Sequence, residues 1–385
     1  MTATGHRAGW IFVKPGVWVE NGMVEVRDGR ITAVCKGRSG DHIVDHGPGV
    51  IMPAMINAHT HLSLSALQGQ LEAQRGFIPW VKDLISARSR LSEEEVFRAT
   101  FIAAREIRSS GTGFIGEVGP THPGAAAMSA NELEGVVFAE VLGNSREVPA
   151  LPRDDNGLSF SFAGHALHTT APDVLTSLKS AAVSRRNVFS IHLAESEAET
   201  EFLERCNGPW AELLTSRGTD FGHWSLGGER PVQRALRLGL LGRGTLAVHV
   251  LQVSRAEISV LAETGTSVCL CPRSNLLLHD RLPDISGLLA AGLAPALGTD
   301  SLASTPSLSL FDEMAFVSER YPHLSPDRLL AFATINAAKA LGQSDLGTVE
   351  PGKRARLIYV DAAGASGQSA ALQLAAGRPQ GVEWL

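Results

Sequence analysis

The sequence is poor in cysteine, in clustered positive charge and in long apolar runs. Its four cysteines form no CxxC pair, so the sequence predicts neither a disulfide framework nor a Cys-rich zinc site. The net charge is −6 and no Lys/Arg cluster stands out, which gives no indication of nucleic-acid or anionic-membrane binding. No apolar stretch reaches the ~18 residues of a membrane span, and the N-terminus shows no signal-peptide pattern. We therefore expect a cytoplasmic protein.

What the chain does contain is enough apolar material for a large core, with 44% hydrophobic and 19% charged residues among 385. Both ends, 1–50 and 342–385, consist of short β-like segments with turn signals and are predicted to form one small β-sandwich. Between them, over 51–341, eight β-like runs alternate with helix-like segments. The runs cover 49–59, 111–118, 135–141, 158–166, 188–194, 245–250, 267–271 and 294–300.

The spacing of these runs favours one architecture. His59 and Asp300 end the first and the eighth run, and the seven steps between them average about 34 residues, a typical βα repeat of a barrel. We predict an α/β fold with a (β/α)8 TIM barrel, the alternative being an open doubly wound sheet. One step is longer because 207–231 is inserted, and its Gly, Pro and Trp content suggests a loop over the mouth of the site.

Polar reactive residues recur at the carboxyl ends of the predicted strands, where barrel enzymes hold their chemistry. They are His59 and His61 after the first strand, His165 and His168 after the fourth, His192 and Glu195 at the fifth, His249 at the sixth and Asp300 at the eighth. One such residue would carry little weight. So many at the same end of the strands predict one convergent site.

The pair His59 and His61 is typical of a metal site. Residues i and i+2 of a strand point to the same side, so both imidazoles can bind one ion, although two loop histidines would give the same pattern. His192 and Asp300 would complete a set of three nitrogens and one oxygen, which suits zinc best and ferrous iron as well. Water bound there would become a hydroxide nucleophile near neutral pH. The fourth strand offers no lysine to bridge a second ion, so we expect one divalent metal.

Two further residues have the chemistry for proton transfer. Glu195 follows His192 in a short turn and could carry the proton of the water to a substrate ring nitrogen. The alternative is a helix N-terminal glutamate that the helix dipole favours. His249 could hydrogen-bond to the metal water or to the developing tetrahedral centre, or be an ordinary strand histidine. The remaining candidates are expected at the surface or in loops: His6, His42, His46, His223, His279 and His323.

Together these motifs resemble the amidohydrolase superfamily, and more narrowly its nucleoside and nucleobase deaminases. The segments that carry the resemblance are PAMINAHTHLSLSAL, HLAES, AVHV, CPRSN and LGTDSLAS, spread over nearly the whole chain. The resemblance implies a mononuclear metal-dependent hydrolytic deaminase that releases ammonia from a 6-aminopurine nucleoside or base. It implies the following roles: metal ligands His59, His61, His192 and Asp300, proton shuttle Glu195, partner of the metal water His249, a second proton acceptor in Asp300, and a substrate contact at His165.

Within this branch the motifs look most like aminodeoxyfutalosine deaminases of menaquinone biosynthesis. Adenosylhomocysteine/methylthioadenosine or guanine deaminase, and hydrolysis of another C–N or C–halogen bond, are the alternatives. Aminodeoxyfutalosine carries a carboxylate, which Arg88 or Arg146 could bind bidentately, and Trp80 with Phe77 could wall an aromatic pocket. A catalytically silent relative would have lost ligands that this chain retains. A homodimer is common in such families and is compatible with this sequence.

Overall fold

The computed structural model of the chain describes residues 3–37, 42–362, 367–377, 379 and 381–385. Its larger sheet has eight parallel strands, paired in the order β13-β12-β11-β10-β9-β8-β7-β6. The strands are β6 (Met55–Thr60), β7 (Thr112–Gly119), β8 (Glu134–Val141), β9 (Leu158–Ala166), β10 (Phe189–Leu193), β11 (Thr245–His249), β12 (Ser267–Leu270) and β13 (Ala296–Leu297). Every residue of β6 and β7 is buried, as in strands that are covered on both faces.

The sheet closes into a barrel where the chain after β13 meets β6. Thr60 and Asp300 form a parallel bridge, and the backbone N–H of His61 donates to the carbonyl of Asp300 at 3.1 Å. Gly298 permits this approach, because a Cβ there would lie 2.9 Å from the Cβ of His59. The predicted (β/α)8 barrel is therefore confirmed, and its closure places the first and last strand ends side by side.

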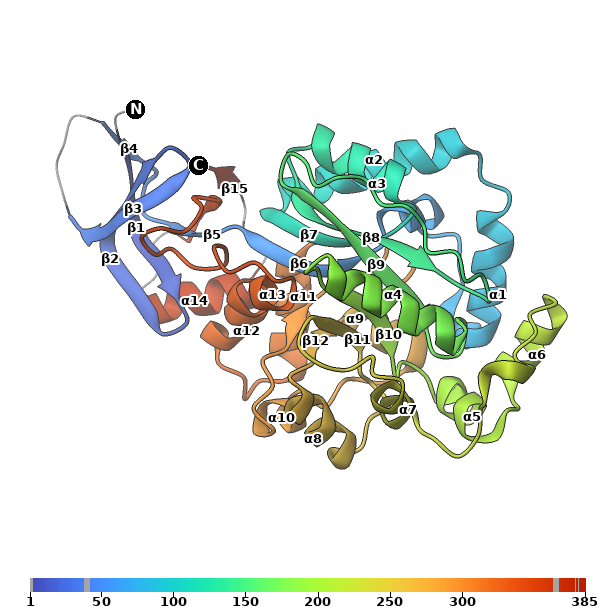
Figure 1. Cartoon of the computed structure of the whole chain (residues 1–385). Coiled ribbons are helices and arrows are strands. Elements are labelled where there is room, and N and C mark those ends of the chain that lie inside the picture. The colour runs from blue at the N-terminus through green and yellow to red at the C-terminus, as the bar shows by residue number, and fades with distance from the viewer. Residues whose placement is uncertain (1–2, 38–41, 363–366, 378, 380) are drawn as a thin grey trace.

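Helices follow the strands and cover the outside of the barrel (Figure 1). They are α1 (Phe77–Arg88), α2 (Glu93–Ser109), α3 (Thr121–Ala130), α4 (Pro172–Ser184), α5 (Glu197–Arg205), α6 (Pro209–Ser216), α7 (Pro231–Arg237), α8 (Arg255–Thr264), α9 (Pro272–His279), α10 (Ile285–Ala290), α11 (Leu310–Arg320), α12 (Pro326–Phe332) and α13 (Ile335–Ala340), with α14 (Gly367–Ala376) near the C-terminus. None of the helices in the described part of the chain has the length and apolar character to cross a bilayer.

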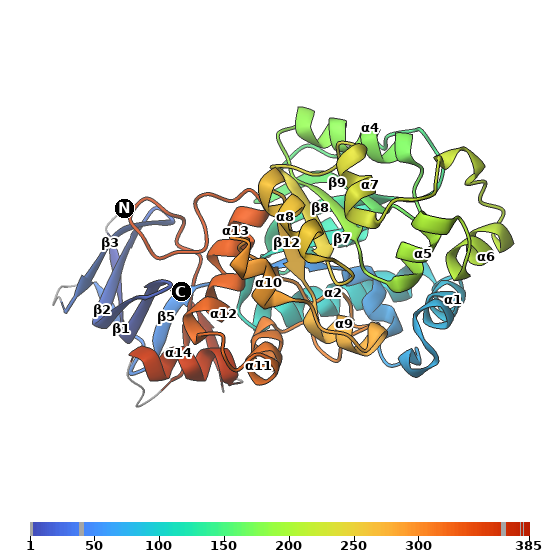
Figure 2. The ribbon, with the colours of Figure 1, turned by 90° about the horizontal axis from the view of Figure 1, so that it is seen from below.

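The strands from both ends of the chain form a second sheet, in the order β15-β14-β5-β1-β2-β3, with β4 beside β1. They are β1 (Thr4–Lys14), β2 (Val17–Arg27), β3 (Arg30–Lys36), β4 (Ile43–Asp45), β5 (Val50–Pro53), β14 (Leu357–Val360) and β15 (Val382–Trp384). In Figures 1 and 2 this sheet lies at one end of the molecule and helices α1 and α6 at the other.

One predicted strand is wrong in detail. The run expected over 49–59 is two strands, since β5 pairs antiparallel with β14 in the terminal sheet and β6 begins the barrel. Between them, the backbone N–H of Ala54 donates to the carbonyl of Arg356 at 2.8 Å. All residues of both strands are buried, so the apolar pattern contains no signal for the change of partner.

Candidate active site

Four side-chain donor atoms converge at the carboxyl ends of β6 and β10 and in the segment after β13. The Nε2 atom of His192 lies 3.4 Å from that of His61 and 3.3 Å from that of His59. Asp300 Oδ1 lies 3.7 Å from His61 Nε2 and 3.9 Å from His59 Nε2. Ligands about 2.1 Å from one tetrahedral zinc lie about 3.4 Å apart, so the spacing of these four atoms fits a single ion.

The chemistry of the histidines fits a metal as well. The Nδ1 atom of His61 lies 2.9 Å from the carbonyl of Val118, and that of His192 lies 2.9 Å from the carbonyl of His165. Donation to these carbonyls leaves the Nε2 lone pairs free and facing one another, the usual arrangement of metal-binding imidazoles. Burial lowers the pKa of His59 and of His61, which keeps both rings neutral.

Asp300 is held so that one oxygen faces the histidines. Its Oδ2 atom accepts hydrogen bonds from Ser274 Oγ at 2.5 Å and from Ser304 Oγ at 2.9 Å, which leaves Oδ1 toward the cluster. The residue has a left-handed backbone with φ of 60°, and His249 has φ of 73°. Such conformations cost about 1–3 kcal/mol in a non-glycine residue and are concentrated at functional sites.

Glu195 and His249 lie next to the cluster. Glu195 Oε1 is 3.8 Å from His249 Nε2 and 3.2 Å from His279 Nε2. His249 Nδ1 lies 3.0 Å from the amide Nδ2 of Asn275, whose donation to Nδ1 leaves a proton on Nε2. Burial raises the pKa of Glu195. The nearby His249 and the hydrogen bond from His279 lower it, and their combined effect outweighs that of burial, so the pKa is well below its usual value. The Glu195 carboxylate is therefore ionised and able to accept a proton.

A buried carboxylate fixes the turn that carries Glu195. Glu199, on the first turn of α5, accepts the backbone N–H of Ala194 at 3.3 Å and that of Glu195 at 2.8 Å. Ala194 is left-handed, with φ of 54°. The position of Glu195 is thus set by side-chain contacts within its own turn.

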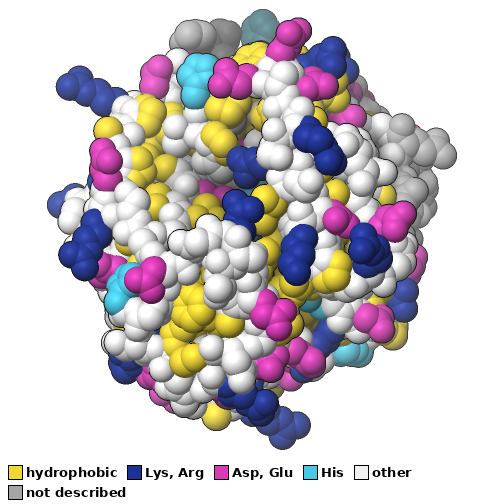
Figure 3. Space-filling view, turned by 90° about the vertical axis from the view of Figure 1, so that its right-hand side faces the viewer, with side chains coloured by type: hydrophobic (Ala, Val, Ile, Leu, Met, Phe, Trp, Pro, Cys, Tyr) yellow, Lys and Arg dark blue, Asp and Glu magenta, His cyan; other side chains and the backbone are white. Residues whose placement is uncertain are grey.

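Three of the four residues of this cluster, His61, His192 and Asp300, line a cavity of about 400 Å³, a size that suits a small-molecule ligand. His165, Trp80 and Arg88 line this cavity. Burial lowers the pKa of His165 to about 3, so its ring is neutral. Figure 3 views the face that carries α1 and α6, where hydrophobic and basic side chains lie close together.

The structure brings most of the predicted site residues together but leaves one outside. Arg146 does not line the cavity; its side chain is 82% exposed and pairs with Asp173 at 2.6 Å. Arg146 follows a predicted strand in the sequence, but this position does not indicate whether its side chain faces the cavity or the solvent. The inserted segment 207–231 does reach the cavity, through Trp210 on helix α6 and through Arg217 and Thr219 in the loop that follows this helix.

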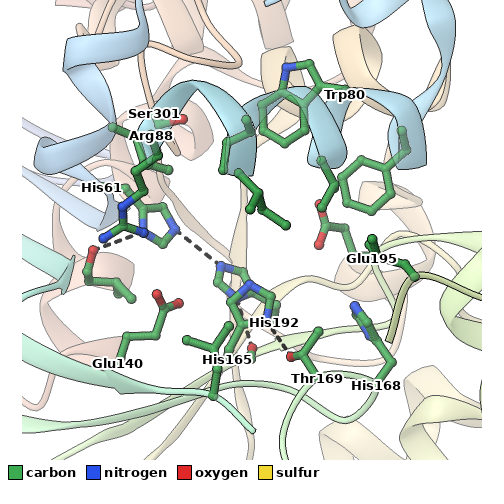
Figure 4. Close-up of a pocket in the computed structure, with 18 of the residues that line it drawn as sticks. His61, Trp80, Arg88, Glu140, His165, His168, Thr169, His192, Glu195 and Ser301 are labelled. Carbon is green, nitrogen blue, oxygen red and sulfur yellow. Dashed lines mark hydrogen bonds between the residues drawn. The ribbon is translucent and has the colours of Figure 1, made fainter. Parts of the chain in front are cut away.

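Two residues near the candidate site were not predicted. His279, expected at the surface, has a side chain only 5% exposed and bonds to Glu195. Glu140, at the end of β8, lines the cavity with a buried Oε1 that has no hydrogen-bond partner within the described structure. Figure 4 shows Glu140 and Glu195 on opposite sides of His192. Glu140 could have been predicted as a site residue because it lies near the end of a predicted strand. His279 lies at the end of a helix, and nothing in the sequence indicated that it is near the site.

Comparison with known proteins identifies relatives of this chain. The model of the amidohydrolase family matches residues 50–378. The 5-methylthioadenosine/S-adenosylhomocysteine deaminase of Symbiobacterium thermophilum is 30% identical over 374 residues, which cover 89% of this chain and 81% of that protein. The 5'-deoxyadenosine deaminase of Methanosarcina mazei is 29% identical over 369 residues, covering 89% and 80% of the two chains.

Solved structures agree with the barrel architecture. Helicobacter pylori aminofutalosine deaminase, in complex with methylthio-coformycin, superposes with a TM-score of 0.87 at 24% identity, and the match covers 99% of this chain and 97% of that one. An adenosine deaminase from Xanthomonas campestris with bound zinc gives a TM-score of 0.82 at 25% identity, with 99% and 91% covered. The first of these likenesses concerns the fold alone.

Proposed function

The chain belongs to the amidohydrolase family, and from this we propose that it is a metal-dependent hydrolytic deaminase that releases ammonia from a 6-aminopurine nucleoside. The observation that carries the proposal is the position of the Glu195 carboxylate. It lies beside a cluster of three imidazoles and one carboxylate, and it lines the same cavity of nucleoside size as His61, His192 and Asp300. Relatives named as nucleoside deaminases match this chain over about 80% of their own length, which supports the same activity.

One divalent ion would be held by His59, His61, His192 and Asp300, and zinc is the metal that we propose. The three imidazole nitrogens and one carboxylate oxygen match the ligand types and the tetrahedral spacing that zinc prefers. Iron(II) accepts the same ligands and is the second choice. When bound there, the metal supplies a Lewis acid that lets water react near neutral pH.

The protein's own side chains would then move the protons. Glu195 accepts a proton from the attacking water and donates it to the ring nitrogen next to the amino-bearing carbon, which makes that carbon electrophilic. His249, with its Nε2–H free, donates a hydrogen bond toward the oxygen that adds to the ring. Asp300 Oδ1 accepts a second proton for the departing ammonia. His165 contacts the substrate from β9.

For the substrate we propose aminodeoxyfutalosine, an intermediate of menaquinone biosynthesis. Arg88 lines the cavity and can bind a carboxylate at the distal end of the substrate. Trp80 lines the same wall and stacks on Phe77 with ring centroids 6.1 Å apart, a surface suited to an aromatic group. Methylthioadenosine and adenosylhomocysteine are the second candidates, because relatives named for them match 80% or more of their own length.

The test is ammonia release by zinc-loaded protein from a panel of aminodeoxyfutalosine, adenosylhomocysteine, methylthioadenosine, adenosine, guanine and cytosine. We expect turnover of at least one adenine nucleoside and a loss of about 100-fold or more in kcat for Glu195→Gln, the usual contribution of a general acid–base. Glu197→Gln is the matched control, since that side chain is 84% exposed in the same turn. Silence across the panel with zinc bound would contradict the deaminase assignment.

A further inference from the structure

We propose that His279 is a positioning residue that holds the Glu195 carboxylate in its reactive orientation, an inference that rests on the proposed deaminase function. Its Nε2 atom lies 3.2 Å from Oε1 of Glu195. In the described part of the chain, no other side chain hydrogen-bonds to this carboxylate, and His249 Nε2 is further away, at 3.8 Å. With Oε1 held by His279, Oε2 is left for the water and the ring nitrogen.

Helix α9, which carries His279, also contacts the two other residues to which we assign a role in the reaction. Ser274 on α9 hydrogen-bonds to Asp300 at 2.5 Å, and Asn275 on α9 hydrogen-bonds to His249 at 3.0 Å. His279 lies four residues after Asn275, and residues i and i+4 share one face of a helix. One short helix therefore holds all three residues to which we assign proton transfer or oxyanion contact.

The residues around His279 restrict its ring and shield its hydrogen bond to Glu195 from water. Its ring packs against Phe77 of α1, with centroids 4.4 Å apart, and its side chain is only 5% exposed. Water has little access to the hydrogen bond, and a bond in such a low-dielectric place is stronger than one at the surface. His279 does not itself line the cavity. Its effect on the reaction therefore passes through Glu195.

The test compares His279→Gln with His279→Asn in the zinc-loaded enzyme. Both variants carry the same amide, but only glutamine is long enough to bring its N–H to the place of Nε2. We expect kcat to fall by about 10- to 100-fold in the asparagine variant, the cost of a catalytic group displaced by about 1 Å, with KM within threefold of the wild-type value. The glutamine variant should recover most of the loss. His122→Asn, at an exposed position of α3, is the matched control.

Equal kcat values for the two variants, or a loss that appears in KM alone, would overturn the positioning role. If the wild-type enzyme releases no ammonia from any panel compound, the proposed function fails by itself. A crystal structure of His279→Asn then decides the inference independently of activity. We expect the Glu195 carboxylate to be displaced or spread over several positions, and an unmoved carboxylate would contradict the proposal.

Discussion

Asp300 shows how one residue combines two tasks at the candidate site. Its Oδ1 atom faces the histidine cluster, while Oδ2 is occupied by the hydroxyls of Ser274 and Ser304. Such outer hydrogen bonds orient the ligand and keep it basic. The sequence identified Asp300 from its place after the eighth strand, but the serines that orient it come from α9 and from the following loop.

Removing one of these hydroxyls should weaken the metal site. We expect Ser274→Ala to lower zinc affinity by about 10- to 100-fold, the usual cost of losing such a partner of a ligand. Competition with a zinc chelator measures the change. Ser286→Ala, at an exposed position of α10 where the hydroxyl hydrogen-bonds to His323, is the control. Unchanged zinc affinity in the Ser274 variant would show that Asp300 is oriented without it.

Residue types at strand ends could be read from the sequence, whereas the directions of side chains could not. Arg88 and Arg146 were equal candidates for a carboxylate contact, yet Arg88 lines the cavity and Arg146 faces solvent beside Asp173. The difference depends on how the chain turns after β8, which local composition does not encode. His279 was missed for a similar reason, because its partner Glu195 is 84 residues away.

Among the elements, the turn from β10 to α5 is held by several specific contacts. Ala194 is left-handed there, and Glu199 accepts the N–H groups of Ala194 and Glu195. The capping pattern at the start of α5, where Ser196 Oγ accepts the N–H of Glu199, could be anticipated from the sequence. The reach of Glu199 back to the strand end is a tertiary feature.

Glu199→Ala should therefore destabilise the protein and disturb catalysis together. Two buried N–H groups would lose their acceptor, at a cost of about 2–4 kcal/mol in the free energy of unfolding. Denaturant titration measures that loss, and kcat should fall as Glu195 gains freedom. Glu197→Ala is the exposed control. A free energy of unfolding within about 0.5 kcal/mol of the wild-type value would contradict this account.

The terminal sheet contains a pair of histidines in contact, and one of them has a shifted pKa. The Nδ1 atom of His6, on β1, lies 3.0 Å from Nε2 of His46, which follows β4. Burial, followed by the neighbouring His46, lowers the pKa of His6 below 6.5, and Glu383 opposes this only in part. The folded state therefore binds this proton less readily than the unfolded state does.

Because the pKa of His6 is lowered in the folded state, the free energy of unfolding should fall as the pH is lowered. At pH 7.5 His6 is largely unprotonated in both states. As the pH drops toward and below 6.5, the unfolded state gains the proton first, which lowers the stability until the folded pKa is passed. We expect the melting temperature of the wild type to fall more between pH 7.5 and pH 5 than that of His6→Gln. Parallel curves for the two proteins would show that His6 does not contribute.

At the scale of the whole molecule, the metal site ties together parts of the chain that are far apart in sequence. Its four proposed ligands come from the carboxyl end of β6, from β10 and from the segment after β13. The end of β6 and the segment after β13 are neighbours at the barrel closure, whereas β10 is four strands away from β6 in the sheet. A metal that binds only the folded state stabilises it by RT ln(1 + [L]/Kd), about 4 kcal/mol when the free metal exceeds Kd by a thousandfold.

Chelation should thus remove activity and lower the melting temperature, and zinc should restore both. The His192→Asn variant, with one ligand lost, should show little change in melting temperature on chelation. Metal analysis before and after treatment verifies the removal. An identical melting temperature for metal-free and zinc-loaded wild type would contradict a site that bridges these strands.

The periodic features of this protein could be predicted from its amino-acid sequence. Eight apolar runs at a regular spacing predicted the barrel, and reactive side chains at their carboxyl ends predicted one site, because parallel strands present these ends on one face. The division of the chain at residues 50 and 342 and the homodimer stay predictions.

Which side chains meet could be seen only in the folded chain. The barrel closes through Thr60 and Asp300, 240 residues apart, and this closure sets the spacing of His59, His61 and Asp300. The fold also places β5 in the terminal sheet and brings His279 to Glu195. The physical reason is that these contacts depend on strand pairing and helix placement over the whole chain, while sequence patterns report burial and local conformation alone.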